Sequence, residues 1–128
     1  MASAEFEAVY AELRERMIRA AANQTVVTDS PGHLVLHAPI PNPLKAAERL
    51  WFGGVQIRKG YVSYHLMPVY SHRALSEQVS PGLAKRMQGK SCFNFKKSDP
   101  VLFDELERLT AEGARRYSQP FDVEKGRC

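Results

Sequence analysis

One stretch constrains the fold more than any other: residues 49–70, which read RLWFGGVQIRKGYVSYHLMPVY. Two apolar-rich runs meet at Lys59-Gly60, a dipeptide suited to a tight turn, and together they predict a β-hairpin. With these two residues in the turn, three apolar positions of one strand pair with three of the other: Ile57 with Val62, Val55 with Tyr64, and Gly53 with Leu66. Such a strand pair has to bury one face, so the rest of the chain is expected to supply a covering layer.

The same register divides the hairpin into two faces. The apolar face, with Trp51 near Pro68 at its end, is expected to lie on the core. The opposite face is polar and aromatic, has Gly54 at its centre, and supplies the candidate ligand-binding residues: Phe52, Gln56, Arg58, Tyr61, Ser63 and His65. An antiparallel sheet can leave one face to solvent, and a glycine within a strand often marks the close approach of another group. This face is therefore either an ordinary solvated surface or a ligand-binding one.

Amphipathic patterns near both ends of the chain predict the covering layer. Apolar residues recur at steps of three to four between Ala4 and Ala22, and a second such pattern follows Pro100, with Ser98 or Asp99 as the N-cap. Between them, residues 33–38 and 91–96 alternate as strands. The remaining segments are predicted to be a connector (23–32), short helical turns (71–89) with Ser80 as an N-cap, and a tail (119–128).

These elements predict a single α+β domain over residues 1–128. It is a two-layer sandwich, in which the N- and C-terminal helices cover one face of an antiparallel sheet of about four strands. No apolar run is long enough to cross a membrane, and the acidic N-terminal segment lacks the apolar core of a secretory signal. We therefore expect a cytoplasmic protein in which Cys92 and Cys128 are free thiols.

Charge is concentrated in the middle of the chain. Residues 49–97 carry nine basic side chains and one acidic one, whereas acids outnumber bases in both flanking segments. Beyond the hairpin face, six of these bases are basic-patch candidates: Lys59, Lys85, Arg86, Lys90, Lys96 and Lys97. Such a block favours an anionic partner if the side chains share a surface, and serves only solubility if they are scattered.

The sequence offers little for conventional catalysis. It contains no glycine-rich phosphate loop, no zinc-ligand spacing and no nucleophile elbow. His33 and His37 share a strand face but lie about 13 Å apart, too far to bind one metal ion directly. Carboxylates are nearly absent around the hairpin, which disfavours an acid–base pair there. We expect a non-enzymatic protein with no catalytic residue, no metal site and no cofactor.

Three segments together resemble the YdhG-like family of small, mostly uncharacterised bacterial proteins: GYVSYHLMPVY, SPGLAKRMQGKSCFNFK and DPVLFDELERL, within residues 48–117. The resemblance implies a compact fold likened to frataxins, with terminal helices on an antiparallel sheet. It also implies an iron-chaperone role described for some members, which uses an acidic ridge on the first helix. In this chain Arg14, Arg16 and Arg19 are interleaved with that helix's glutamates, whereas hard cations favour clustered carboxylates.

Three functional hypotheses follow. The first is a binding or accessory protein that uses the polar hairpin face for an anionic small ligand or a protein partner. The second, by family analogy alone, is a frataxin-like iron chaperone. The third is a nucleic-acid-binding protein that uses basic residues beside Tyr61, with binding that weakens steeply as salt rises: Arg58, Lys59, Lys96 and Lys97. No membrane partner is expected, and the chain is a monomer or a homodimer that closes the exposed sheet.

Overall fold

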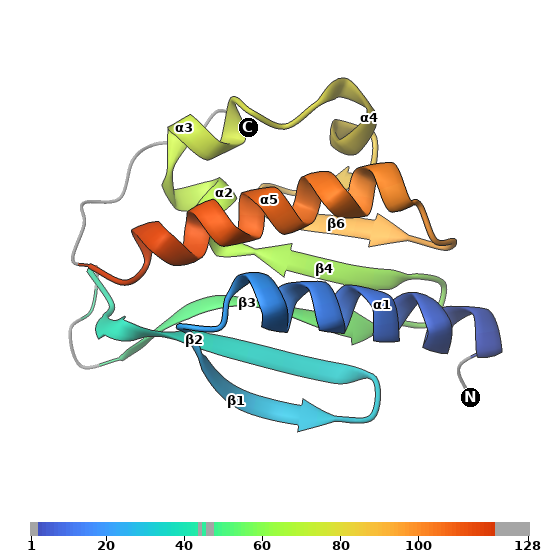
Figure 1. Ribbon diagram of the computed structural model, residues 1–128, viewed down its shortest axis with the longest axis horizontal. Helices are drawn as coiled ribbons and strands as arrows, with labels where there is room; N and C mark the ends of the chain where they lie inside the picture. Colours follow the sequence, from blue (N-terminus) through green and yellow to red (C-terminus); the bar gives the residue numbers. More distant parts are fainter. Residues whose placement is uncertain (1–2, 44, 46–47, 120–128) are drawn as a thin grey trace.

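The computed structural model describes residues 3–43, 45 and 48–119. The elements follow in the order α1 (Ala4–Ala20), β1 (Thr25–Ser30), β2 (His33–Pro41), β3 (Arg49–Ile57), β4 (Val62–Leu66), α2 (Met67–Ser71), α3 (Arg73–Ser76), α4 (Pro81–Ala84), β5 (Met87–Gln88), β6 (Cys92–Phe95) and α5 (Pro100–Arg116) (Figure 1). This order confirms the predicted α+β class with a helix at each end of the described chain. Of the predicted tail, residues 119–128, only Gln119 belongs to the described residues, and it is exposed.

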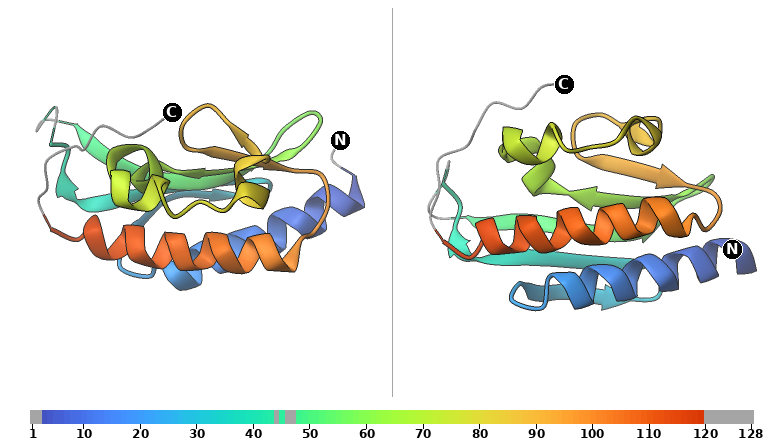
Figure 2. Two further views of the ribbon diagram at one scale, coloured as in Figure 1. Left: turned by 90° about the horizontal axis from the view of Figure 1, so that it is seen from above. Right: turned by 45° about the horizontal axis from the view of Figure 1, so that its top comes forward.

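The strands form one six-stranded sheet in the order β1-β2-β3-β4-β6-β5, and every neighbouring pair is antiparallel. Helices α1 and α5 lie side by side against one face of it (Figure 2). The short helices α2, α3 and α4 all contact α5 and extend the same layer. The described helices therefore cover one face of the sheet and leave the other uncovered.

The sheet has two strands more than the sequence predicts. Strand β1 occupies residues 25–30, within the segment expected to be a connector; its side chains are mostly exposed, so no buried alternation marks it. Strand β5 is only two residues long, too short to show a period. The helical turns predicted over residues 71–89 end at Ala84, and Met87 lies in β5 instead.

The helix ends follow their capping residues. Ser80 accepts a hydrogen bond from the backbone N–H of Leu83, and Asp99 accepts one from Leu102, with a proline in the first turn of each helix. Both caps are as predicted, since a side-chain acceptor satisfies an N–H group that the helix itself leaves unpaired. Helix α1 ends at Ala20, two residues earlier than expected.

The core lies between the helix layer and the sheet. Its largest side chains come from β3, β4, β6 and α5. Phe95 of β6 and Phe103 of α5 make an edge-to-face contact across the two layers, with ring centroids 4.9 Å apart. The buried hydroxyl groups of Tyr64 and Thr110 bond to each other across the two layers. This contact fixes α5 over the middle of the hairpin.

The hairpin has the predicted register, but its far end does not have the predicted faces. Strand β3 pairs with β4 from Gly53–Leu66 to Ile57–Val62. On its other side, Gly53 lies opposite Leu36 whereas Trp51 lies opposite His37. Phe52 is therefore the extra residue of a β-bulge, and strict alternation ends there.

The bulge reverses two predicted orientations. Phe52 is fully buried, and its ring meets that of Tyr117 on the helix side at a centroid distance of 5.6 Å. Trp51 instead lies against His65 on the uncovered face, with ring centroids 5.0 Å apart. The prediction that Phe52 belongs to the binding face and Trp51 to the core is wrong, because β2 pairing shifts the register at this point.

Candidate functional site

The uncovered side of the sheet is defined by the residues that alternate with the core. We call it the open face, and its central residues are Val35, Trp51, Gln56, Ser63, His65, Cys92 and Asn94. On β4, Val62, Tyr64 and Leu66 are buried in the core, so the intervening Ser63 and His65 point the other way. On the neighbouring strands Gln56 pairs with Ser63 and Cys92 pairs with His65. The register thus brings side chains of four strands onto one surface.

Trp51 and His65 form an aromatic platform at one end of the open face. The Trp51 Nε1–H donates to the carbonyl oxygen of Gly53 at 3.1 Å, which fixes the orientation of the indole. Its ring is tilted by 44° against the imidazole of His65. Burial lowers the pKa of His65, and the nearby Arg58 lowers it further, so the imidazole is neutral near pH 7.

Two imidazoles of this face carry a nitrogen without a partner. His37 lies opposite Trp51, and burial together with Arg49 lowers its pKa. The Nδ1 atoms of both His37 and His65 are buried and make no hydrogen bond among the described residues. A neutral imidazole offers one donor and one acceptor, so each ring retains hydrogen-bonding capacity beside the platform.

Arg58 brings positive charge to the other end of the open face. Its Nη1 donates to Gln56 Oε1 at 3.1 Å, which holds the guanidinium beside the face. The Ser63 hydroxyl donates to the backbone oxygen of Gln56 at 3.4 Å, across the hairpin. The same guanidinium lowers the pKa values of His65 and Cys92, so its field extends across two further strands.

Cys92 is a half-buried thiol on this face. Its Sγ lies 3.3 Å from Asn94 Oδ1. Burial raises its pKa more than Arg58 lowers it, so the thiol rather than the reactive thiolate prevails near neutral pH. Asn94 in turn donates to Gln88 Oε1 at 2.6 Å, which ties the thiol to the last strand of the sheet.

Most of the predicted basic residues gather at one end of the sheet, beside Arg58. Lys59 lies in the β3–β4 turn, and Lys96 and Lys97 follow β6, whose Phe95 is paired with Val62. Arg86 precedes β5, and its carbonyl oxygen accepts from Asn94 N–H at 2.8 Å. We call this group the basic end, and its exposed members are Arg58, Lys59, Lys85, Arg86, Lys96 and Lys97.

Lys90 does not belong to the basic end. It lies in the β5–β6 turn, at the opposite end of those two strands, with its ammonium 5.5 Å from the ring centroid of Tyr70. Five of the six basic-patch candidates therefore lie at or beside this end of the sheet with Arg58, whereas Lys90 lies at the opposite end of β5 and β6.

Among residues 3–43, 45 and 48–119, most acidic side chains belong to the other layer. Strands β2 to β6 contain no aspartate or glutamate. Asp29 of β1 accepts from Arg14 on α1 at 2.9 Å, so it lies on the helix side. Helices α1 and α5 together carry eight acidic and six basic side chains. The open face and its basic end are consequently positive, and the helix layer is acidic overall.

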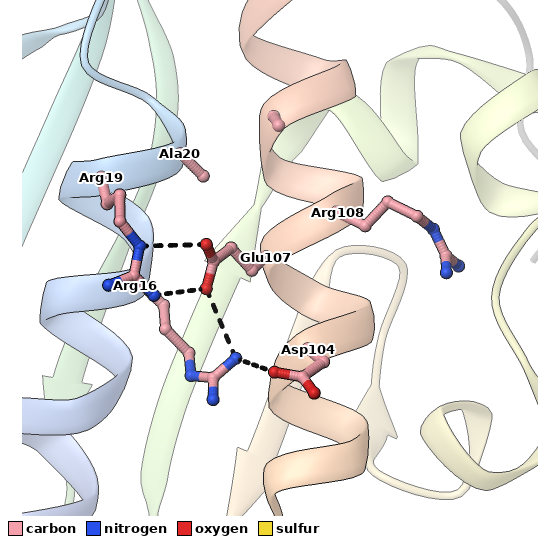
Figure 3. A pocket seen from close by; sticks show the side chains of 7 residues that line it. Arg16, Arg19, Ala20, Asp104, Glu107 and Arg108 are labelled. Atoms are coloured by element: carbon pink, nitrogen blue, oxygen red, sulfur yellow. Dashed lines mark hydrogen bonds and ion pairs between the residues drawn. The ribbon is translucent and has the colours of Figure 1, made fainter.

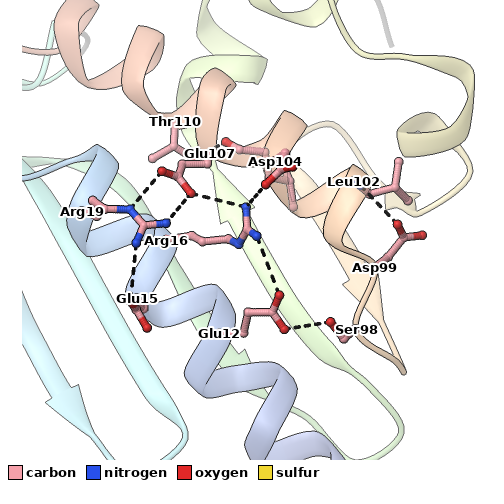
Figure 4. A network of polar contacts seen from close by, with 11 residues as sticks. Glu12, Glu15, Arg16, Arg19, Ser98, Asp99, Leu102, Asp104, Glu107 and Thr110 are labelled. Carbon is pink, nitrogen blue, oxygen red and sulfur yellow. Dashed lines mark hydrogen bonds and ion pairs between the residues drawn. The ribbon is translucent and has the colours of Figure 1, made fainter.

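The groove between α1 and α5 is a hollow outside the open face, but its charges neutralise one another (Figure 3). Arg16 lies 2.6 Å from a carboxylate oxygen of Asp104, and Arg19 lies 2.7 Å from Glu107. Glu12 and Glu15 of α1 join the same ion-pair network, Glu12 also accepting from the Ser98 hydroxyl (Figure 4). We call this network the α1–α5 seam, and its form is that of a helix-to-helix contact.

The seam also bears on the iron hypothesis. The two glutamates nearest the middle of α1 are paired with Arg16 and Arg19 rather than clustered toward solvent. Across residues 3–43, 45 and 48–119, no group of three histidine, cysteine, aspartate or glutamate side chains is arranged to hold a metal ion.

A second hollow borders the open face near the β1–β2 turn, lined by Glu7, Tyr10, Pro31, Gly32, His33, Gln56 and Ile57. It reaches the open face through His33 and Gln56, which are cross-strand partners. Glu7 places a carboxylate in its wall, so this hollow is less suited to an anion.

The predicted ligand-binding residues lie in three environments. Gln56, Tyr61 and His65 are half-buried and Arg58 is exposed, whereas Ser63 is buried among its neighbours. Phe52 lies in the core and is absent from the site. The sequence missed Trp51, His37, Cys92 and Asn94 as neighbours of the hairpin face. Cys92 and Asn94 belong to the strand predicted at residues 91–96, so placing that strand beside β4 was the one step needed to find them.

No helix of the described residues has both the length and the apolar character to span a bilayer. The sequence matched no protein-family model, no curated protein and no solved structure when compared with each.

Proposed function

We propose that this protein is a non-enzymatic binding protein that holds an anionic ligand on the open face. The observation that carries the proposal is the separation of charge between the layers. The open face and its basic end gather the cations, while the carboxylates of α1 and α5 lie on the far side of the sheet. An anion on the open face thus meets attraction without nearby repulsion.

The geometry around Arg58 supports an anion-binding role for that residue. Its side chain is exposed, is oriented by Gln56, and belongs to none of the ion pairs that occupy the arginines of α1. A guanidinium in this setting presents several N–H donors to a carboxylate or phosphate. His65, Ser63 and Asn94 add neutral hydrogen-bonding groups from the adjacent strands.

Binding is favoured over catalysis by the chemistry of the same residues. His65 has no carboxylate neighbour on strands β3, β4 or β6 to orient it as a general base. Cys92 is held as a thiol by burial. Recognition of charge by exposed side chains also implies an affinity that falls as salt screens the basic end.

A titration with inorganic tripolyphosphate tests the proposal. Amide chemical-shift changes in NMR spectra are expected for residues 56–65 and 92–97, and not for the middle of α1 or α5. Arg58→Gln is expected to weaken tripolyphosphate binding at least threefold, equivalent to about 0.7 kcal/mol, because it removes the oriented cation.

Arg108→Gln is the matched control. Arg108 is exposed on α5 and points away from the seam (Figure 3), so its loss changes net charge equally without touching the open face. Equal weakening by the two substitutions, or shifts that map to α1 and α5, would contradict the proposal, since net charge alone would then explain binding.

A further inference from the structure

The open face combines two features that belong to different parts of a ligand. The Trp51–His65 platform offers flat aromatic surface, and the basic end offers cations at the other end of the same strands, with Arg58 held beside Gln56 of the open face. From this pairing we infer that the anionic ligand is a single-stranded nucleic acid, with an unpaired base on Trp51 and phosphates at the basic end. The inference rests on the proposed function of the open face and specifies its ligand class.

Trp51 is suited to stacking by its position and its restraint. It is half-buried rather than enclosed in the core, although the core-forming Phe52 is its immediate neighbour. Its N–H is already bonded to Gly53, so the ring contributes its flat surface rather than a polar contact. An ordered ring loses little rotamer freedom on binding, and stacking of a base on an aromatic side chain is worth about 1–3 kcal/mol.

The bulge at Phe52 is what creates this platform. Strict alternation would turn Trp51 into the core and Phe52 outward. The extra residue instead places the indole beside His65. Bulges often re-aim a side chain near a functional site, and here the result is two rings together on a surface otherwise lined by small and polar groups.

The separation between the platform and the basic end fits a linear ligand. Along β3, Trp51 and Arg58 are about 20 Å apart at the usual rise per residue. A compact anion reaches one end only, whereas a flexible strand of several nucleotides spans both. Successive phosphates then lie near Arg58, Lys96 and Arg86, which the strand register brings to the same end of β3, β6 and β5.

A single strand fits this face better than a duplex or an acidic peptide. Base faces in a duplex are stacked inside it and cannot reach Trp51. An acidic peptide supplies charge but not a regular series of planar rings. Open antiparallel sheets that bind single strands use this combination of surface aromatic rings and flanking cations.

The experiment uses Trp51 as its own probe, because it is the only tryptophan of the chain. The full chain is titrated at low salt with a single-stranded oligothymidylate of about ten nucleotides, a length within the usual site size. The comparison ligand is an abasic oligonucleotide of equal length, which carries the phosphates without the bases. We expect the oligothymidylate, but not the abasic oligonucleotide, to quench Trp51 fluorescence. We also expect the oligothymidylate to bind at least fivefold more tightly than the abasic oligonucleotide.

Substitution separates stacking from charge. Trp51→Leu, followed by the anisotropy of labelled oligonucleotide, is expected to weaken oligothymidylate binding at least fivefold and to leave abasic binding unchanged. Tyr70→Leu is the control, since Tyr70 is an exposed aromatic residue on α2 beside Lys90. Circular dichroism verifies that both variants are folded.

The outcomes distinguish the inference from the proposed function. If both oligonucleotides bind equally without quenching, or a duplex binds as tightly as the single strand, the inference is overturned while an anion-binding face remains. If neither oligonucleotide binds at low salt and tripolyphosphate shifts no amide of the open face, both ideas fail. Quenching of Trp51 fluorescence by the oligothymidylate in the parent protein, together with oligothymidylate binding that Trp51→Leu weakens and Tyr70→Leu leaves unchanged, would support the inference.

Discussion

At the scale of single residues, Trp51 and Phe52 show how one extra strand position changes two environments. They are adjacent in sequence, yet Phe52 packs on Tyr117 in the core and Trp51 lies on His65 at the surface. Their difference can be measured by removing each ring in turn.

We expect Phe52→Ala to lower the free energy of unfolding by about 3–5 kcal/mol, because it leaves a cavity beneath α5. Trp51→Ala is expected to cost clearly less, since the indole is only half-buried. Urea denaturation followed by circular dichroism compares the two without depending on tryptophan fluorescence. A larger loss of stability for Trp51→Ala than for Phe52→Ala would contradict the orientations that the bulge gives the two rings.

Residue-by-residue reasoning predicted part of this site. Alternation from the Lys59-Gly60 turn correctly placed Gln56, Ser63 and His65 on one face, because the register near a tight turn depends only on the hairpin itself. The same alternation failed at Trp51 and Phe52, which lie farther along β3 from the turn. There the pairing of β3 with β2 decides the orientation, and a distant strand leaves no local signal.

At the scale of elements, the two glycines of β3 are required by close backbone contacts. A Cβ atom on Gly53 would lie 2.4 Å from the carbonyl oxygen of His65, and one on Gly54 would lie 2.3 Å from that of Leu34. Neither oxygen belongs to a flexible side chain, so a larger residue has to displace a paired strand. The central sheet thus depends on glycine at both positions.

Gly53→Ala and Gly54→Ala are each expected to lower the free energy of unfolding by about 1–3 kcal/mol, the usual cost of overpacking. Gly60→Ala is the control, because no atom lies within 4 Å of its added Cβ. That change is expected to stay within about 0.5 kcal/mol of the parent protein. Thermal or urea denaturation checks the difference, and equal effects at the three sites would argue against the close contacts.

Elements that the sequence missed share a physical cause. Strand β1 is an edge strand with Val26 and Val27 exposed, so burial imposes no two-residue period on it. Strand β5 extends the sheet by two residues only, and its pairing comes from β6 rather than from its own composition. Long amphipathic helices and central strands were predicted correctly because each buries a continuous face.

At the scale of the whole molecule, the α1–α5 seam ties together segments far apart in the sequence. Glu107 accepts from Arg19 at 3.0 Å, and this bond is the main cause that lowers its pKa. A carboxyl group whose folded-state pKa is lowered stabilises the fold above its unfolded pKa. That contribution is lost as the pH falls through the folded pKa.

We therefore expect the free energy of unfolding of the parent protein to fall between about pH 5 and pH 3. Glu107→Gln is expected to be less stable near neutral pH and to show a smaller decrease over this range. Urea denaturation at several pH values measures both effects. Glu5→Gln, an exposed change of the same kind in the first turn of α1, is the control and should follow the parent curve. If Glu107→Gln and the parent lost the same free energy of unfolding over this range, the ion pairs of Glu107 would not contribute to the pH dependence of stability.

The position of α5 has a consequence for the chain during its synthesis. Strands β1 to β4 are neighbours both in sequence and in the sheet, so they can pair as they emerge from the ribosome. The apolar face of the sheet is fully covered only when α5 packs on it, which brings Thr110 to Tyr64 and Phe103 to Phe95. A nascent chain that stops at Lys97 exposes apolar surface on that side of the sheet. We expect chaperones to retain such chains, because the sheet is synthesised before the helix that covers it.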